Sequence, residues 1–270
     1  MKNCILHQLF ACTDKIYGST VIKHFRSVDD FGHWWLLGSI WIKDDRSLVI
    51  RTWPTLNIAY IISSELADRT NEILKALGIV SSISCVAFHK RTTEDNYLNF
   101  QKSKGCASYV GFNGGNQRVF LGPSCRMGNI VHEIFHALGT THEHTRKDRD
   151  KYITVLSQNI KKGKERNFHK KEITNNLDHP YDLISIMHYG RFVFSRNGLP
   201  TIVTHVKDED KVRYMGQRFK VTKLDGKKLR TLYHCGMCSL WCRPNRSNAR
   251  VNLHCLVSFV FPSFPNKPEQ

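Results

Sequence analysis

The segment from His132 to Asp150 constrains the fold of this chain more than any other stretch. His132 and His136 are four residues apart, so on a helix both imidazoles project from one face and can bind a single metal ion. Glu133 lies about 100° further round such a helix, off the metal but close to a metal-bound water. Apolar residues before and between the histidines predict a helix that packs against a core. Taken alone, this spacing also fits an ordinary amphipathic helix with two histidines.

Two residues beyond the helix favour a metal site. Gly139 can adopt a positive φ, which lets the chain leave the helix abruptly and return His142 as a third ligand. Three neutral nitrogen ligands with one open position are typical of a catalytic zinc site, because structural zinc sites are closed by four protein ligands. The sequence therefore predicts one zinc ion, bound by His132, His136 and His142.

The residues after His142 resemble the astacin family of zinc endopeptidases, a branch of the metzincins. The family signature continues past its third histidine as Glu-His-x-Arg-x-Asp-Arg-Asp, and residues 143–150 match it without a departure. Residues 185–190, Ser-Ile-Met-His-Tyr-Gly, are similar to the family's Met-turn. The similarity covers about residues 47–235, with shorter matches at residues 106–111, 114–117, 159–160, 194–198 and 216–218.

The resemblance implies an α+β fold of the metzincin, zincin-like type. A mixed β-sheet with two helices would form the upper half, and an irregular lower half would end in a C-terminal helix. Zinc would lie in the cleft between the halves. The implied activity is hydrolysis of internal peptide bonds in protein and peptide substrates.

The resemblance also assigns catalytic roles. Glu133 would take a proton from the zinc-activated water and pass it to the leaving amine, as general base and then general acid. Tyr189 would be an additional zinc ligand that swings away and stabilises the oxyanion. A phenol suits both tasks, because it binds metal when ionised and donates a hydrogen bond when protonated.

Two further residues would support the site. Met187 would form an apolar floor under the histidines without binding zinc. In the family, the glutamate at the position of Glu143 holds the new amino terminus that propeptide removal creates. From the residues alone, Glu143 could equally be a surface partner for Arg146 or Arg149.

Four of the nine cysteines stand at positions that form disulfides in the astacin family. The resemblance implies the disulfides Cys85–Cys235 and Cys106–Cys125, and such bonds imply secretion. The other cysteines are odd in number, so at least one is free, intermolecular or removed by processing. They are Cys4, Cys12, Cys238, Cys242 and Cys255. A zinc knuckle made of Cys235, Cys238, Cys242 and Cys255 is the alternative for part of this set.

The resemblance divides the chain into residues 1–46, a signal-like and propeptide-like region, residues 47–236, the peptidase domain, and residues 237–270, a short tail. The first residues form only a weak signal peptide. Ser19 stands where the family's propeptide aspartate occupies the zinc, which puts zymogen latency by that route in doubt. Cleavage is expected near Arg46–Ser47. Asn245 begins a glycosylation sequon, so the product is expected to be a glycoprotein.

The formal net charge of +17 raises the question of an anionic partner. The basic residues are dispersed and no nucleic-acid motif accompanies them, so nucleic acid is not expected as a partner. Residues 161–171 form the densest cluster, which fits a solvated surface or, as a weaker inference, a contact with anionic matrix. No apolar run approaches the roughly 20 residues that span a bilayer.

Periodicity predicts the order of the elements. Strands are expected at residues 55–63, 84–89, 97–101, 107–112 and 117–121, and helices at residues 64–77, 127–138 and 222–233. The helix at residues 64–77 would end at Gly78. The chain between residue 139 and the last helix is expected to be rich in loops. Residues 108–111 would lie near the edge strand that, in the family, pairs with an extended substrate.

Two other functions compete with a secreted zinc endopeptidase. One is a catalytically silent, astacin-shaped binding protein, which a lost ligand or a lost base would favour. The predicted ligands, the predicted base and Tyr189 are all present. The other is nucleic-acid binding driven by charge, which predicts a steep dependence of affinity on salt and no proteolysis.

Overall fold

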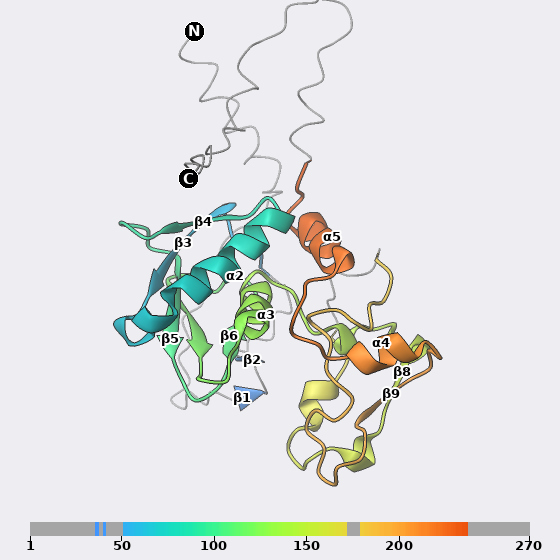
Figure 1. The fold of residues 1–270 in the computed structure, drawn as a ribbon. Helices are drawn as coiled ribbons and strands as arrows, with labels where there is room; N and C mark the ends of the chain where they lie inside the picture. The colour runs from blue at the N-terminus through green and yellow to red at the C-terminus, as the bar shows by residue number, and fades with distance from the viewer. Residues whose placement is uncertain (1–35, 38–39, 42–50, 172–178, 237–270) are drawn as a thin grey trace, which may run out of the picture. The chain divides into compact units, whose positions relative to one another are not determined.

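The computed structural model describes residues 36–37, 40–41, 51–171 and 179–236 (Figure 1). Within these residues a seven-stranded sheet has the order β1-β2-β6-β7-β5-β3-β4. The pairs β3–β4, β3–β5 and β5–β7 are parallel, whereas β6 runs antiparallel to β7. The strands are β1 (Leu36–Leu37), β2 (Ile40–Trp41), β3 (Asn57–Ile62), β4 (Ala87–Lys90), β5 (Tyr97–Lys102), β6 (Ala107–Tyr109) and β7 (Asn116–Leu121).

The burial of two strands explains why the sequence predicts them. β7 alternates buried and more exposed residues, with Gln117, Val119 and Leu121 buried, and this period of two is the signal of a strand. β5 instead buries three consecutive residues from Leu98 to Phe100, as strands packed on both faces do. Both strands form within one residue of their predicted bounds.

The first helix differs from its prediction at both ends. Residues 64–69 form a 3₁₀ helix, η1 (Ser64–Arg69), and α2 spans Thr70–Ile83. Its buried residues are Ile73, Ala76, Leu77 and Val80, so the apolar face continues beyond Gly78. A side chain at Gly78 would meet no atom within 4 Å, and this glycine lies inside the helix instead of ending it. Burial of Val80 therefore outweighs the weak helix propensity of glycine.

α2 and α3 (Met127–Ala137) run across one face of the sheet (Figure 1). The main hydrophobic core joins these helices to the strands and includes Ile73, Phe100, Val119, Ile134 and Phe135. Because α3 buries every residue from Ile130 to Ala137, its two histidines are held inside the molecule.

The second part of the described chain has its own hydrophobic cluster. β8 (Ile153–Val155) pairs antiparallel with β9 (Ile202–Thr204), and Ile153, Phe168 and Ile202 are buried beside them. The helices α4 (Glu209–Tyr214) and α5 (Lys223–Leu232) follow. The sequence predicts α5 but neither α4 nor this sheet. α4 buries none of its residues, and strands of three residues are too short to show a period.

The position of β6 bears on the expected substrate-binding edge. β6 lies between β2 and β7, because Ile40 pairs with Ser108 and Trp41 with Tyr109 in a parallel register. In this structure the strand expected near the substrate edge is therefore covered by a preceding segment of the same chain.

Two disulfides cross-link the described residues. Cys85 is bonded to Cys235 over a sequence separation of 150 residues, and Cys106 is bonded to Cys125. A loop of that length is worth on the order of 5 kcal/mol in the chain-entropy model. These pairs are the ones that the resemblance implies, and Cys235 is accordingly not part of a zinc knuckle. The other five cysteines, Ser19 and Asn245 lie outside the described residues. Within the described part of the chain, no helix has the length and apolar character needed to cross a membrane.

Candidate metal centre and active site

Three buried histidines bring their ring nitrogens together. His132 and His136 lie one turn apart on α3, and His142 follows the turn at Gly139, where φ is 102°. The Nε2 atom of His142 is 3.2 Å from the Nε2 atom of His132 and 3.2 Å from that of His136. The three residues form a group that can hold a metal ion.

The hydrogen bonds of the rings leave these nitrogens available as ligands. His132 Nδ1 donates to the carbonyl oxygen of Ile186 at 2.8 Å, and His136 Nδ1 donates to that of Thr140 at 2.8 Å. A carbonyl oxygen only accepts, so each Nδ1 carries the proton and each Nε2 presents its lone pair. Burial lowers the pKa of His136 to about 3, so this ring is neutral at physiological pH. Burial also lowers the pKa of His132 and of His142 well below the ordinary value. Three neutral imidazoles, two of them oriented by backbone carbonyl oxygens, fit a zinc ion.

The start of α3 packs tightly against a distant loop. A Cβ atom at Gly128 would lie 1.5 Å from the carbonyl oxygen of Arg218, so only glycine allows this contact. The backbone nitrogen of Arg126 donates to Oδ1 of Asn129 at 3.2 Å and closes the first turn. These contacts fix the position of the amino end of α3.

Aromatic side chains fix the other end of α3. Trp53 Nε1 donates to the carbonyl oxygen of Ala137 at 2.9 Å, and the Tyr233 hydroxyl donates to that of Leu138 at 3.0 Å. The Gly139 nitrogen donates to the carbonyl oxygen of His136 at 2.8 Å. The last carbonyl groups of a helix lack partners within the helix, and these donors supply them. These hydrogen bonds fix the carboxyl end of α3, from which the turn leading to His142 begins.

Glu133 lies beside the histidines with one carboxylate oxygen unused. The residue is buried, and its Oε2 atom has no hydrogen-bond partner among the described residues. Burial raises the pKa of Glu133 well above its ordinary value, and the guanidinium of Arg218 partly offsets this effect. A buried polar atom without a partner is costly, which suggests that this oxygen receives a water or a substrate atom.

Tyr189 lies against the third histidine. Its ring centroid is 4.4 Å from that of His142, and the same ring stacks on His144 with the centroids 3.9 Å apart. Burial raises the pKa of Tyr189, so its phenol is protonated at neutral pH. His188 Nδ1 donates to the Tyr189 carbonyl oxygen at 2.6 Å, and His188 Nε2 is 2.8 Å from the hydroxyl of Tyr181. The turn that carries Tyr189 is thus anchored through His188.

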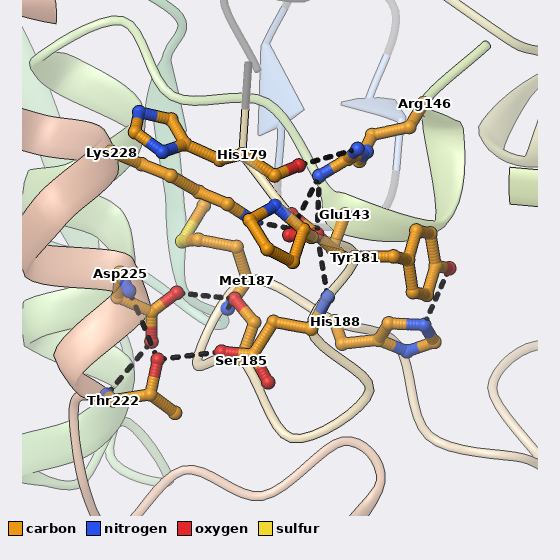
Figure 2. A network of polar contacts seen from close by, with 12 residues as sticks. Glu143, Arg146, His179, Tyr181, Ser185, Met187, His188, Thr222, Asp225 and Lys228 are labelled. Carbon is orange, nitrogen blue, oxygen red and sulfur yellow. Dashed lines mark hydrogen bonds and ion pairs between the residues drawn. The ribbon is translucent and has the colours of Figure 1, made fainter. Parts of the chain in front are cut away.

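Glu143 is the centre of a buried polar network (Figure 2). Its Oε1 atom accepts hydrogen bonds from Lys228 Nζ at 2.6 Å, from Asp182 N at 2.9 Å and from Arg146 Nη1 at 3.1 Å. Arg146 was one of the two expected partners, but Glu143 is 1% exposed, so this pair is not at the surface. Arg149 donates instead to the carbonyl oxygens of His144 and Phe168.

Asp225 on α5 holds the turn that carries Met187. Its carboxylate accepts a hydrogen bond from the Ser185 hydroxyl (Figure 2). It also accepts one from the Ile186 nitrogen at 3.0 Å. The carbonyl oxygen of the same Ile186 accepts the hydrogen bond of His132. Sequence reasoning missed this residue and Lys228. The only signal was the Thr222-x-x-Asp225 capping box, which predicts a helix start and no role at a site.

Residues 45–234 match the family model described as Astacin, a peptidase family. The chain is 39% identical over 194 residues to zinc metalloproteinase nas-14 of Caenorhabditis elegans, which covers 69% of this chain and 38% of that protein. It is 38% identical over 193 residues to zinc metalloproteinase nas-4 of the same organism, covering 69% of this chain and 60% of that protein. The chain thus spans less than two thirds of the length of these relatives.

A solved structure with a similar fold is high choriolytic enzyme 1, a hatching enzyme zinc-protease from Oryzias latipes (medaka fish). The TM-score is 0.63 at 34% identity, over 70% of this chain and 96% of that one. This similarity and the match to the family model confirm the predicted α+β fold and the zinc dependence. The chain belongs to the astacin family of peptidases.

Proposed function

We propose that this chain is the peptidase part of a zinc endopeptidase that hydrolyses internal peptide bonds of proteins. The observation that carries the proposal is the joint burial of three convergent histidine nitrogens and a glutamate with an unused oxygen. His132, His136 and His142 would hold a zinc ion, which would supply Lewis acidity and bring the pKa of water to near neutrality.

Glu133 performs the proton transfers in this proposal. Its raised pKa, caused by burial, moves the carboxyl group towards the operating pH, where it both takes and returns a proton efficiently. It takes the proton of the attacking water and delivers it to the nitrogen of the departing amine. Its Oε2 atom makes no hydrogen bond to another described residue, which is consistent with this task.

Tyr189 stabilises the charge that develops on the carbonyl oxygen of the substrate. Its phenol is protonated, because burial raises the pKa, so it donates a hydrogen bond to that oxygen. Met187 provides an apolar surface beneath the histidines. It follows Ile186, whose carbonyl oxygen accepts the hydrogen bond of His132, and it lies two residues before Tyr189.

Glu133→Gln tests the mechanism. With the protein expressed under oxidising conditions, cleavage of casein is expected to fall by roughly 10²–10⁴-fold while zinc content stays unchanged. Tyr189→Phe is expected to lower kcat more than it changes KM. Cleavage that survives Glu133→Gln or a chelator would contradict the mechanism. A folded, zinc-loaded protein that cleaves nothing would favour the catalytically silent alternative.

We also propose that residues 1–46 act as a signal and propeptide region, with residues 47–236 as the peptidase domain and residues 237–270 as a tail. Support comes from β2, which pairs along β6 where an extended substrate strand would bind. A specific protease site placed between Arg46 and Ser47 tests this role. Activity is expected to appear only after that cut, and full activity of the uncut chain would contradict it.

Secretion is the proposed destination, because Cys85–Cys235 and Cys106–Cys125 need an oxidising compartment. The sequon at Asn245 is the proposed glycosylation site. Expression in a secreting eukaryotic cell tests both points. The protein is expected in the medium, with a mass that decreases on treatment with a glycosidase and not in the variant Asn245→Gln.

The basic surface around the 3₁₀ helix η5 (Glu165–Phe168) is the proposed contact for anionic matrix. Lys161, Lys162 and Arg166 are exposed there. Reversing these three charges to glutamate is expected to lower the salt concentration at which the protein leaves a heparin column. The matched control reverses the exposed Lys75, Lys90 and Lys104, and an equal effect of both variants would show that only net charge matters.

A further inference from the structure

A buried lysine of α5 reaches the residue next to the third zinc ligand. Lys228 Nζ lies 2.6 Å from Glu143 Oε1, although the two residues are 85 positions apart. The side chain of Lys228 is 6% exposed and that of Glu143 is 2% exposed. Figure 2 shows the lysine extending from the helix to the carboxylate, on which the guanidinium of Arg146 also converges.

A buried ion pair is a weak source of stability. Removing an ammonium and a carboxylate from water costs much of what their attraction returns, and apolar residues of similar volume often stabilise a fold as well. Arg146 already provides one cation at 3.1 Å from the same oxygen. A second buried cation is therefore better explained by the geometry that it imposes than by the stability that it adds.

That geometry concerns the zinc ligands. Glu143 directly follows His142, and its backbone nitrogen donates to the carbonyl oxygen of Met187 at 3.0 Å. Its carboxylate also accepts a hydrogen bond from the backbone nitrogen of Asp182. The position of Glu143 thus determines how the His142 turn meets the segment that ends in Tyr189.

The same face of α5 acts on the other side of the metal centre. Asp225 lies three residues before Lys228, which puts the two side chains on neighbouring positions of the helix surface. Asp225 binds the Ile186 nitrogen, and the Ile186 carbonyl oxygen accepts the hydrogen bond of His132. One helix therefore contacts the supports of two ligands.

We infer that Lys228 is a positioning residue, whose ammonium holds the Glu143 carboxylate and thereby keeps His142 in the ligand set. The inference rests on the proposed function as a zinc peptidase. It gives Glu143 a cationic partner from within residues 47–236, whereas the resemblance implies a partner in the new amino terminus. Lys228 touches neither substrate nor zinc and acts only through Glu143.

The test is the rate at which zinc leaves the protein. Lys228→Met removes the ammonium and keeps the length of the side chain, and it is expected to speed zinc release to a colorimetric chelator by roughly 10–100-fold. Lys228→Arg restores a cation and is expected to release zinc at close to the unmodified rate. Lys227→Met, at an exposed position of the same helix, is the matched control and is expected to change nothing.

A second variant separates positioning from folding. Lys228→Met combined with Glu143→Gln removes both charges and is expected to release zinc more slowly than Lys228→Met alone, because the buried carboxylate that has lost its nearer cation is removed as well. In steady-state assays on fully zinc-loaded protein, Lys228→Met is expected to lower kcat with little change in KM.

Unchanged zinc release in Lys228→Met, with only a lower melting temperature, would overturn the inference and leave a role in stability. Equal acceleration by Lys227→Met would also overturn it. Failure of the proposed function gives a different result, because the unmodified protein would then bind no zinc, or the Glu133→Gln variant would cleave casein as fast as the unmodified protein.

Discussion

The residues of the active site lie on two kinds of backbone, a regular helix and an irregular turn. His132, Glu133 and His136 are on α3, where backbone hydrogen bonds within one helix set their directions. Met187 and Tyr189 are on an irregular turn, which is held by Asp225, by His188 and by the backbone of Glu143. A helix orients its side chains locally, whereas this turn depends on the side chain of Asp225, about 40 residues away in the sequence. Changes in α3 should therefore act through packing, and changes around the turn through buried polar contacts.

The largest expected effect concerns protons on the histidines in the absence of zinc. Burial keeps His132, His136 and His142 neutral in the folded state, so the unfolded state binds more protons once the pH falls below about 6.5. Stability of the zinc-free protein is expected to decrease from that pH downward, towards the pKa of about 3 of His136. Urea unfolding between pH 7 and pH 4 measures the slope. A flat profile would show that these rings are not buried in the neutral form.

The turn is most sharply tested at Asp225. Asp225→Ala leaves the Ile186 nitrogen and the Ser185 hydroxyl without their acceptor, and it is expected to cost about 3 kcal/mol of folding free energy. Zinc release should also accelerate, because the Ile186 peptide group supports His132. Asp210→Ala, at an exposed position of α4, is the control. If unfolding and zinc release equal those of the control, Asp225 does not stabilise the turn that carries Met187 and Tyr189.

The helix is tested by adding one methyl group. Gly128→Ala places a Cβ atom against the backbone of Arg218 and is expected to destabilise the protein by about 2–3 kcal/mol. Gly78→Ala, in the open interior of α2, is expected to stabilise it by about 0.5–1 kcal/mol. Chemical denaturation of both variants gives the two signs. The same sign for both would show that the start of α3 adjusts without cost.

The smallest effect is expected at the end of α3. Trp53→Phe removes the hydrogen bond to the Ala137 carbonyl group and is expected to cost about 1 kcal/mol. The catalytic constant should change little, because Tyr233 still binds the next carbonyl group of the helix. Thermal unfolding and steady-state kinetics on one preparation measure both quantities. A large loss of kcat at unchanged stability would mean that the hydrogen bond from Trp53 also sets the directions of the α3 side chains at the active site.

The same distinction explains what could be predicted from the sequence. The histidine spacing and Gly139 are local signals, so the ligand group and α3 follow directly from them. Strands such as β7 alternate clearly enough to be predicted within one residue. Lys228 carries no such signal, because its partner is 85 residues away and a lysine on a helix normally faces solvent. The end of α2 differs from the prediction at Gly78, because the burial of Val80 continues the helix beyond this residue despite the low helix propensity of glycine.

The pairing of β2 with β6 has a kinetic consequence. Under the proposed maturation, a strand within the same chain would compete with substrate at an effective concentration on the order of millimolar, the range that short linkers give. A substrate at micromolar concentration would then rarely displace it, however well its side chains fit. Cutting the tether changes no contact between the strands, yet it lets the competitor diffuse away. Under the proposed maturation, one hydrolysed bond would therefore turn a persistent occupant into a dilute peptide, and the gain in activity would come from dilution.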